Sequence, residues 1–338
     1  MKKIVLTGGG TAGHVIPNIA LLPELQKHFD EIIYIGSGKE IEKKLVEKES
    51  IAYYSVSAVK YQRNNPLSLL KIPFLLEKAI KEAMEILKNI KPSVVFSKGG
   101  YVSLPTVFAA HKLNIPVVVH ESDFSLGLAN KVSLPYCKKY ITSFPTTPLK
   151  SKGVFIGQPI RETIFKGNKN NVLDFKNDRQ NLLVVGGSTG AKNLNDFIYK
   201  IKDELNFNII HITGKGKNDG YIQNDFYKTY EYLENIYDYY DWSDVILSRA
   251  GAGACFEISA LNKRAVFVPL ENKASRGDQL LNANYYSGFN NMEVLYEKDF
   301  SKDNLLKAIS NATNNKKNPY VFDRRVNEKI VSQIIECM

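Results

Sequence analysis

The stretch IVLTGGGTAGH, residues 4–14, joins a short β-branched run to four glycines and a histidine. The apolar run predicts a buried strand ending at Gly8, and the pattern after it predicts a helix that opens near Pro17. Glycines between a strand and a helix let the backbone approach an oxyanion, and the helix N-terminus adds about half a positive charge. The stretch therefore predicts a phosphate-binding loop or a tight turn that packs the helix onto its strand.

A second stretch of this kind, LLVVGGSTGA at residues 182–191, begins the other half of the chain. Ser188 within it can add a hydroxyl donor to the backbone amides, which suits a diphosphate. Further short apolar runs lie at residues 32–36, 94–98, 117–121, 209–214, 244–248 and 265–269. Helical patterns separate them, notably residues 67–89. This alternation predicts an α/β fold of two Rossmann-like, doubly wound parallel-sheet domains.

The length of 338 residues also favours two domains. A polar, turn-rich stretch within residues 153–176 predicts the connection. We place the first domain at residues 1–155 and the second at residues 156–338. The last helix, at about residues 320–336, is expected to pack back on the first domain.

Charge and cysteine content limit the possible classes of protein. The net charge is +10, and residues 1–150 carry +8 of it, from 20 Lys and Arg against 12 Asp and Glu. Nucleic acid, an anionic membrane surface or a phosphorylated substrate could each explain this basic half. Cys137, Cys255 and Cys337 form no CxxC pair, so neither a disulfide framework nor a zinc site is predicted, and a reducing cytoplasm is expected. The sequence has no apolar run of about 18 residues, the length that a membrane-spanning helix needs.

Two motifs leave alternatives open at this point. Gly8, Gly10 and Gly13 formally spell the dinucleotide fingerprint, but the next predicted strand ends in Ile35-Gly36-Ser37 without the acid that would hold a ribose. No P-loop sequence is present. In DVILSRAGAGACFE, residues 244–257, small residues follow a strand, and Glu257 falls about one turn into a helix. That carboxylate either accepts both hydroxyls of a ribose or is an ordinary solvated glutamate.

Seven motifs together resemble a known family. They are GGGTAGHVIPNIAL (residues 8–21), FSKGGYVSLP (96–105), HESDFSLGLANK (120–131), GQPIR (157–161), GGSTGAKNLN (186–195), SRAGAGACFEISAL (248–261) and SRGDQLLNA (275–283). In this order they resemble the glycosyltransferase family 28 enzymes that add N-acetylglucosamine (GlcNAc) to lipid I in peptidoglycan synthesis. The resemblance implies the GT-B fold, with two Rossmann-like domains facing a cleft. It implies UDP-GlcNAc as donor, bound mainly by the C-terminal domain, and lipid I as acceptor, bound mainly by the N-terminal domain.

The resemblance also implies roles for individual residues. The residues expected at the donor are Thr11, Ala12, Gly13, Asp123, Arg161, Ser188, Leu233, Ala252, Gly253, Glu257, Asp278 and Gln279. The residues expected at the acceptor are Gly9, Gly10, His14, Gly100, Tyr101, Glu121 and Asn130. Ala12 stands where the family often has glycine, and Ser122-Asp123 where many members have Gln-Asn, so Asp123 is either a second candidate base or simply an acceptor contact.

The implied reaction inverts the anomeric centre: the acceptor 4-hydroxyl displaces UDP from the α-linked donor and leaves a β-linkage. Such a displacement needs a base for the hydroxyl proton and stabilisation of the charge that builds on UDP. His14 is the candidate base, with an ordinary pKa near 6.5; the alternative is that it caps the loop or binds acceptor phosphate. Ser188, Arg161 and the amides of the second loop are expected to stabilise the diphosphate. No D-x-D motif is present, so neither a metal nor another cofactor is expected.

Lipid I lies in the membrane, which predicts a peripheral enzyme at the cytoplasmic face of the cell membrane. An apolar cluster of about ten residues includes Leu69, Leu70, Phe74 and Leu75, with Lys60, Arg63, Lys71 and Lys78 around it. Such a segment can lie in the interface of a bilayer rich in anionic phospholipid. The alternative is an ordinary core-facing helix. Other cell-wall synthesis proteins are further expected partners.

Three other functions stay open from the sequence. One is a GT-B enzyme with another acceptor, such as a diacylglycerol glucosyltransferase. Another is a non-hydrolysing nucleotide-sugar epimerase, which shares the two-domain fold. The third is a nucleic-acid-binding module suggested by the charge, although no known reader motif is present.

Overall fold

The structure, a computed structural model, describes residues 1–58, 68–145, 152–173, 175, 177–187, 190–271 and 277–338, without the side chains of residues 12 and 68–72. The chain divides into two compact units. Unit 1 contains Met1–Arg161 and Asp323–Met338, and unit 2 contains Glu162–Phe322. The predicted boundary after residue 155 falls short of this division. The predicted second domain ran to residue 338 with its last helix packing back on the first domain, and residues Asp323–Met338 do belong to unit 1.

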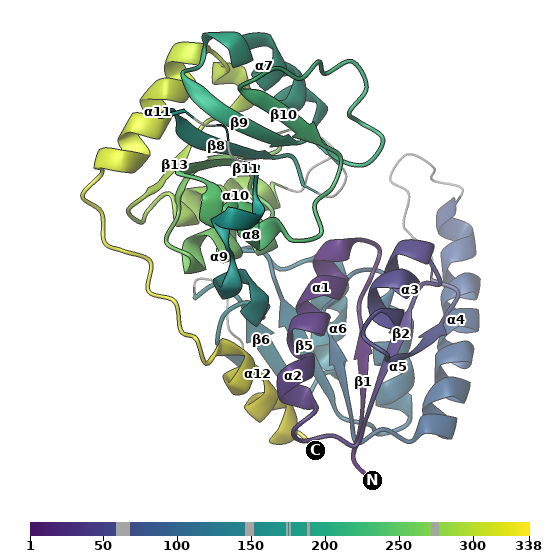
Figure 1. Cartoon of the computed structure of the whole chain (residues 1–338). Coiled ribbons are helices and arrows are strands. Elements are labelled where there is room, and N and C mark those ends of the chain that lie inside the picture. The colour runs from purple at the N-terminus through teal and green to yellow at the C-terminus, as the bar shows by residue number, and fades with distance from the viewer. Residues whose placement is uncertain (59–67, 146–151, 174, 176, 188–189, 272–276) are drawn as a thin grey trace. The chain divides into compact units, whose positions relative to one another are not determined.

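The described residues of unit 1 form a sheet of seven parallel strands in the order β3-β2-β1-β4-β5-β6-β7. The strands are β1 (Lys3–Thr7), β2 (Glu31–Gly36), β3 (Ala52–Ser55), β4 (Val94–Ser97), β5 (Val117–Glu121), β6 (Lys139–Thr142) and β7 (Gly153–Phe155). The helices are α1 (Ala12–Ala20), α2 (Leu22–Leu25), α3 (Glu40–Glu47), α4 (Ser68–Ile90), α5 (Ser103–Lys112), α6 (Leu128–Ser133) and α12 (Val326–Ile335), with a 3₁₀ turn η1 (Leu134–Tyr136). In Figure 1, α12 lies beside α2.

Both faces of this sheet are buried because helices cover each of them. Val5, Ile33 and Val95 pack with apolar residues of α4 and α5, while the alternate residues Leu6 and Phe96 are buried on the other face. Continuous apolar strands are typical of parallel sheets for this reason. Helix α1 packs beside α3, and α4 beside α5.

The described residues of unit 2 form a second parallel sheet, of six strands in the order β10-β9-β8-β11-β12-β13. The strands are β8 (Gln180–Val185), β9 (Phe207–Ile212), β10 (Tyr227–Tyr230), β11 (Val245–Arg249), β12 (Arg264–Val268) and β13 (Met292–Val294). The helices are α7 (Lys192–Ile201), α8 (Ile236–Trp242), α9 (Ala252–Ala260), α10 (Asp278–Tyr286) and α11 (Lys302–Asn314). The 3₁₀ turns are η2 (Glu162–Lys166), η3 (Lys169–Asn171), η4 (Lys202–Glu204) and η5 (Glu297–Asp299). Apolar residues of α7 and α11 fill its core against β8, β9, β11 and β12.

The strand orders locate the places where a ligand can bind. In each sheet the order reverses beside the first strand of the unit, between β1 and β4 and between β8 and β11. Ligands of doubly wound sheets bind at the carboxyl ends of the strands at such a reversal. The two glycine stretches follow β1 and β8, so each lies at the reversal of its own sheet.

Candidate functional site

The first glycine loop, residues 8–10, leads from β1 into α1. Gly10 has φ +94°, a conformation that favours glycine, and a Cβ there would lie 2.7 Å from the Tyr101 ring. Gly100, with φ +79°, would bring a Cβ within 2.6 Å of the Gly9 carbonyl oxygen. The loop therefore packs directly on the turn that follows β4 and brings Gly9, Gly10, Gly100 and Tyr101 together, while their predicted contact with the acceptor stays a prediction.

Glu42 of α3 holds this loop, and no sequence motif pointed to it. Its side chain is fully buried. One carboxylate oxygen accepts the Gly10 N–H at 2.6 Å, and the other accepts the Ser37 N–H at 2.9 Å. The Tyr53 hydroxyl donates to the second oxygen at 3.4 Å. The dinucleotide fingerprint expects an acid at the end of β2, and none is present there. Glu42 of the next helix lies nearby instead, and it binds the backbone of the loop.

His14 lies in the first turns of α1 with one ring nitrogen held in place. The hydroxyl of Thr11 and Nδ1 of His14 are 3.0 Å apart. On the other side of the ring, Nε2 would lie 3.5 Å from a Cβ at Gly100. The ring is half-buried, whereas Thr11 and Gly13 are exposed. This geometry presents Nε2 toward the turn after β4.

Glu121 ends β5 and organises the loop that follows. Its buried carboxylate accepts the N–H groups of Ser122 at 2.9 Å, Asp123 at 3.0 Å and Gly127 at 2.8 Å, and the Asn130 amide at 2.8 Å. Hydrogen bonds to an ionised acceptor are the stronger kind, so the loop is tightly folded around this group. Glu121 and Asn130 shape the loop in this structure, and their predicted contact with the acceptor stays a prediction.

The side chains of Lys98 and His120 are buried beneath these loops, and neither residue was predicted to belong to the site. Lys98 follows β4, and its Nζ lies 2.6 Å from Nδ1 of His120 and 3.4 Å from Oε1 of Gln158. His120 Nε2 lies 2.9 Å from the Gly157 carbonyl oxygen. Burial lowers the pKa of Lys98 to about 7, against the opposing effect of Glu121 and Asp123. Burial, with the nearby Lys98 charge, also lowers the pKa of His120 well below its ordinary value.

The second glycine loop is built around buried Gly186 and ends at α7. The Gly190 N–H donates to the Gly187 carbonyl at 3.0 Å, and Ser188 itself lies outside the described residues. Asn195 of α7 holds the base of the loop, since its Oδ1 would lie 3.3 Å from a Cβ at Gly186. The same oxygen lies 3.1 Å from Nε2 of His211, whose Nδ1 faces the Tyr227 hydroxyl at 2.9 Å. Burial lowers the pKa of His211 to about 3, so the ring is neutral and its Nε2 carries the proton toward Asn195.

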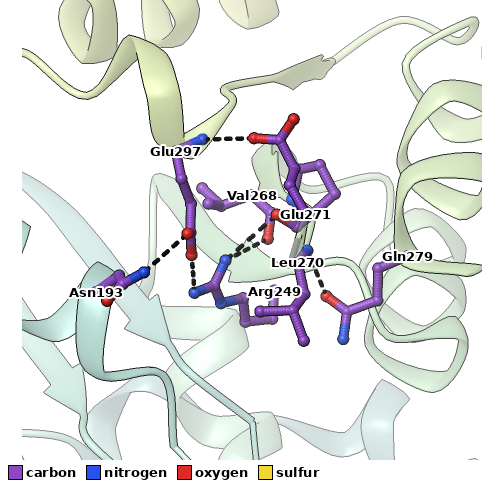
Figure 2. Close-up of polar contacts among 8 residues, drawn as sticks. Asn193, Arg249, Val268, Leu270, Glu271, Gln279 and Glu297 are labelled. Atoms are coloured by element: carbon purple, nitrogen blue, oxygen red, sulfur yellow. Dashed lines mark hydrogen bonds and ion pairs between the residues drawn. The ribbon is translucent and has the colours of Figure 1, made fainter. Parts of the chain in front are cut away.

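Arg249 ends β11, next to the second glycine loop. Its guanidinium is buried, donates to the carbonyls of Val268 at 3.3 Å and Pro269 at 3.4 Å, and forms an ion pair with Glu297. Figure 2 shows this pair with the ends of β11 and β12 around it. The pair therefore joins the carboxyl ends of two central strands to η5.

The same network extends to α7 and α10. Glu297 also accepts the Asn193 amide at 2.9 Å, and its own N–H donates to Glu271 at 3.1 Å (Figure 2). Gln279, a predicted donor residue, accepts the Leu270 N–H at 3.1 Å through Oε1. This bond sets the orientation of the Gln279 amide, so its NH₂ group (Nε2) can donate a hydrogen bond to another partner. Asp278 begins α10 after Gly277.

The other predicted donor residues of unit 2 cluster at α9. Ala252 is the first residue of the helix and is buried, while Gly253 is exposed with nothing within 4 Å of an added Cβ. Glu257, half-buried, lies in the next turn, and the Tyr240 hydroxyl approaches its Oε2 at 3.5 Å. Leu233 is half-buried before α8. Predicted donor residues Thr11, Ala12, Gly13, Asp123 and Arg161 belong to unit 1.

The predicted membrane segment falls on the start of α4. Phe74 is 78% exposed and Leu75 39%. The side chains of Leu69, Leu70 and Lys71, and all of Lys60 and Arg63, lie outside the described residues. Lys78 is exposed and forms an ion pair with Glu82 at 3.9 Å, which partly balances its charge. No described helix is both long and apolar enough to cross a membrane.

No group of three or more His, Cys, Asp or Glu within the described residues is arranged to hold a metal ion. The Glu257 carboxylate and the Gln279 amide are among the groups predicted to contact the donor, and these contacts stay predictions.

Comparison with known proteins identifies both halves of the chain. The model of the glycosyltransferase family 28 N-terminal domain matches residues 4–142, and that of the family's C-terminal domain matches residues 181–338. A Lachnospira eligens protein named UDP-N-acetylglucosamine–N-acetylmuramyl-(pentapeptide) pyrophosphoryl-undecaprenol N-acetylglucosamine transferase is 47% identical, with 91% of this chain and 90% of the relative aligned. A Clostridium tetani protein of the same name is 45% identical, over 91% and 89%.

Solved structures share the architecture. MurG of Acinetobacter baumannii superposes with a TM-score of 0.74 at 24% identity, covering 99% of this chain and all of the other. A UDP-GlcNAc 2-epimerase from Neisseria meningitidis superposes with a TM-score of 0.64 at 16% identity, covering 99% and 100%. At these identities the likeness concerns the fold alone, and it confirms the predicted GT-B class with its two parallel-sheet α/β domains.

Proposed function

The chain belongs to glycosyltransferase family 28, and we propose that it moves GlcNAc from UDP-GlcNAc to the 4-hydroxyl of the N-acetylmuramyl group of lipid I. The product is lipid II, the disaccharide precursor of peptidoglycan. The names of relatives that are 43–47% identical over about nine tenths of the chain support this substrate pair. The motifs predicted for donor and acceptor all lie at, or next to, the carboxyl ends of the strands.

The observation that carries the mechanism is the contact between Thr11 and His14. A general base needs one unprotonated ring nitrogen aimed at the hydroxyl and the other nitrogen held as a donor. The 3.0 Å contact suits an Nδ1–H that donates to the Thr11 oxygen, which leaves Nε2 as the basic nitrogen. Nε2 is also the ring atom on the side of Gly100, within the predicted acceptor residues.

The transfer then proceeds as one displacement. The acceptor oxygen forms a bond to C1 of GlcNAc while the bond from C1 to the diphosphate oxygen breaks. The electron pair of the broken bond stays on UDP, and the hydroxyl proton passes to Nε2 of His14. Attack on the face opposite the leaving group inverts the centre from α to β.

The charge on the departing UDP needs stabilising donors. We assign this work to Ser188, to amides of the second glycine loop and to Arg161. The Arg249–Glu297 pair and the Asn195–His211 contact fix the strands and the helix that flank that loop. Preorganised donors contribute more than groups that must first turn toward the charge.

Recognition of the rest of the donor is assigned to unit 2. Glu257 accepts the ribose hydroxyls, and the small residues Ala252 and Gly253 leave room for the nucleoside, with Leu233 near the uracil. Gln279, whose orientation is set by its bond to Leu270, contacts the sugar hydroxyls together with Asp278. Asp123 in the loop held by Glu121 is assigned to the donor as well.

The acceptor carries a polyprenyl chain, so the enzyme has to work at a membrane. We place it at the cytoplasmic face as a peripheral protein, with the exposed Phe74 and Leu75 of α4 entering the lipid interface. Anionic phospholipid would attract the basic first half of the chain, and other cell-wall synthesis proteins are further partners that this location allows.

A transfer assay tests the function against its alternatives. Purified protein is incubated with UDP-GlcNAc and with lipid I, diacylglycerol or no acceptor. The products are then separated, and their masses are measured by mass spectrometry. We expect one added GlcNAc on lipid I, none on diacylglycerol, and unchanged donor without acceptor. A product on diacylglycerol alone, or an epimerised donor formed without acceptor, would exclude the proposal.

A further inference from the structure

Lys98 and His120 are fully buried beneath the loops of unit 1 that are assigned to the acceptor, and neither takes part in the reaction described above. Lys98 also belongs to the base of the first glycine loop. Its N–H donates to the Thr7 carbonyl at 2.9 Å, and its Cβ would lie 3.1 Å from a Cβ at Gly8. Burying a charged side chain in such a place costs free energy unless the charge is paired and hydrogen-bonded.

The hydrogen bonds define how the pair is connected. His120 Nε2 faces a carbonyl oxygen, that of Gly157, so this nitrogen carries the proton and Nδ1 is the acceptor. The Lys98 amine therefore donates to Nδ1 at 2.6 Å and to the Gln158 oxygen at 3.4 Å. The Ser143 hydroxyl donates to the same Gln158 oxygen at 2.8 Å.

We propose that Lys98 is a positioning residue for the acceptor side of unit 1: its amine ties the turn at residues 120–123 and the segment at residues 157–158 to the base of the first glycine loop. His120 is next to Glu121, which folds the acceptor loop, and Gln158 precedes Arg161 in the GQPIR motif. The inference rests on the proposed function for what these loops bind.

The surroundings of Lys98 make its protonation state responsive near neutral pH. Its two hydrogen-bond partners, His120 and Gln158, are neutral groups. The charged groups that act on it are Glu121 and Asp123, which favour the ammonium without outweighing its burial, so that the pKa falls to about 7. The His120 ring stays neutral because its own pKa is lowered well below 6.5. Raising the pH through neutrality therefore removes the charge from the Lys98–His120 bond and, with it, the cost of burying an ammonium.

The same shift predicts how folding stability depends on pH. The pKa of Lys98 is about 7 in the folded chain and near 10.5 in the unfolded one, so the unfolded state binds more protons between these values. Stability then rises with pH across this window, by up to tenfold per pH unit in the unfolding constant. His120 acts in another window: its depressed pKa removes stability only as the pH falls below about 6.5.

The test uses Lys98→Met, which keeps the length of the side chain without its amine, and Lys88→Met on the exposed end of α4 as control. Urea unfolding from pH 7 to pH 10 should show the pH-dependent rise in the wild type and the control, and a rise smaller by up to tenfold per pH unit in Lys98→Met. Hydrogen exchange at pH 7 should be faster within residues 118–130 of Lys98→Met and unchanged within residues 206–214 of unit 2. The acceptor KM should increase about tenfold, the effect of about 1.4 kcal/mol, and UDP affinity should be kept.

His120→Phe is the second variant, because it keeps a ring of similar size while the acceptor for Lys98 is lost together with the donor to the Gly157 carbonyl. It should give the same faster exchange and higher acceptor KM, and it decides the question if Lys98→Met does not fold. Folded variants with wild-type exchange in residues 118–130 and wild-type acceptor KM would overturn the inference. A wild-type protein that fails to transfer GlcNAc to lipid I would instead refute the proposed function, while exchange and unfolding still judge the role of Lys98.

Discussion

Replacing Glu42 by glutamine removes one acceptor from the group that holds the first glycine loop. In the wild-type protein the Glu42 carboxylate accepts the Gly10 N–H with one oxygen at 2.6 Å and the Ser37 N–H with the other at 2.9 Å. The glutamine keeps one oxygen and places an NH₂ group against the remaining N–H donor. Whichever way the amide turns, one part-buried backbone donor loses its partner beside the fully buried side chain.

The size of the effect follows from those two bonds. A buried donor without a partner costs about 1–3 kcal/mol, and the bond that survives loses its charge-assisted part, about 1 kcal/mol. Glu42→Gln should therefore destabilise unit 1 by about 2–4 kcal/mol. Glu47→Gln on the same helix is the matched control, since its exposed pair with Lys43 at 3.7 Å contributes roughly 0.5 kcal/mol or less.

The assay has to measure the stability of unit 1. The single tryptophan, Trp242, lies in unit 2, so its fluorescence follows the other half of the chain. Hydrogen exchange of the Gly10 and Ser37 amides, with urea unfolding followed by far-UV circular dichroism, should show the loss in Glu42→Gln. The kcat for transfer should fall with UDP affinity unchanged. Protection and stability equal to those of Glu47→Gln would refute the role given to Glu42.

Three more variants test the site and the membrane segment. His14→Ala should lower kcat about 100-fold, the low end of the contribution of a general base, with UDP binding kept in calorimetry; near-normal turnover would remove it as the base. Glu257→Ala should weaken UDP binding about tenfold or more, as expected for a lost hydrogen bond to a charged group of about 1.5–3 kcal/mol, and an unchanged calorimetric affinity would take it out of the donor site. The pair Phe74→Ser and Leu75→Ser should reduce flotation with anionic vesicles while transfer to a short-chain acceptor persists; undiminished flotation would show that α4 is not the attachment site.

The strands that the sequence predicted are the central ones. Apolar runs such as 4–8 and 182–187 became β1 and β8 because both faces of a parallel sheet are covered, which leaves a continuous hydrophobic signal. The strands that were missed are short or lie at the edges: β3 is mostly exposed, and β7 and β13 have three residues each. An edge strand needs little apolar surface, so its pattern is weak.

The residues of the candidate site also fall into two groups, those that the sequence could identify and those that it could not. His14 and Gly100 could be selected because the motifs around them resemble those of the family, and His14 also ends a glycine loop that follows a predicted strand. Glu42, Lys98 and Glu297 could not, because each acts through a contact between segments far apart in the chain. Glu42 reaches Gly10 across 32 positions and Glu297 reaches Arg249 across 48. Such pairs become visible only when the sheet order brings α3 and η5 beside the loops.

The configuration of the transferred sugar tests the central claim most directly. GlcNAc from α-linked UDP-GlcNAc is transferred to lipid I by the wild-type protein, and the product is examined by NMR at the anomeric carbon and at the site of attachment. A single displacement with His14 as base predicts one β-linked GlcNAc on the 4-hydroxyl of the N-acetylmuramyl group. An α-linked product, or attachment at another hydroxyl, would contradict the account.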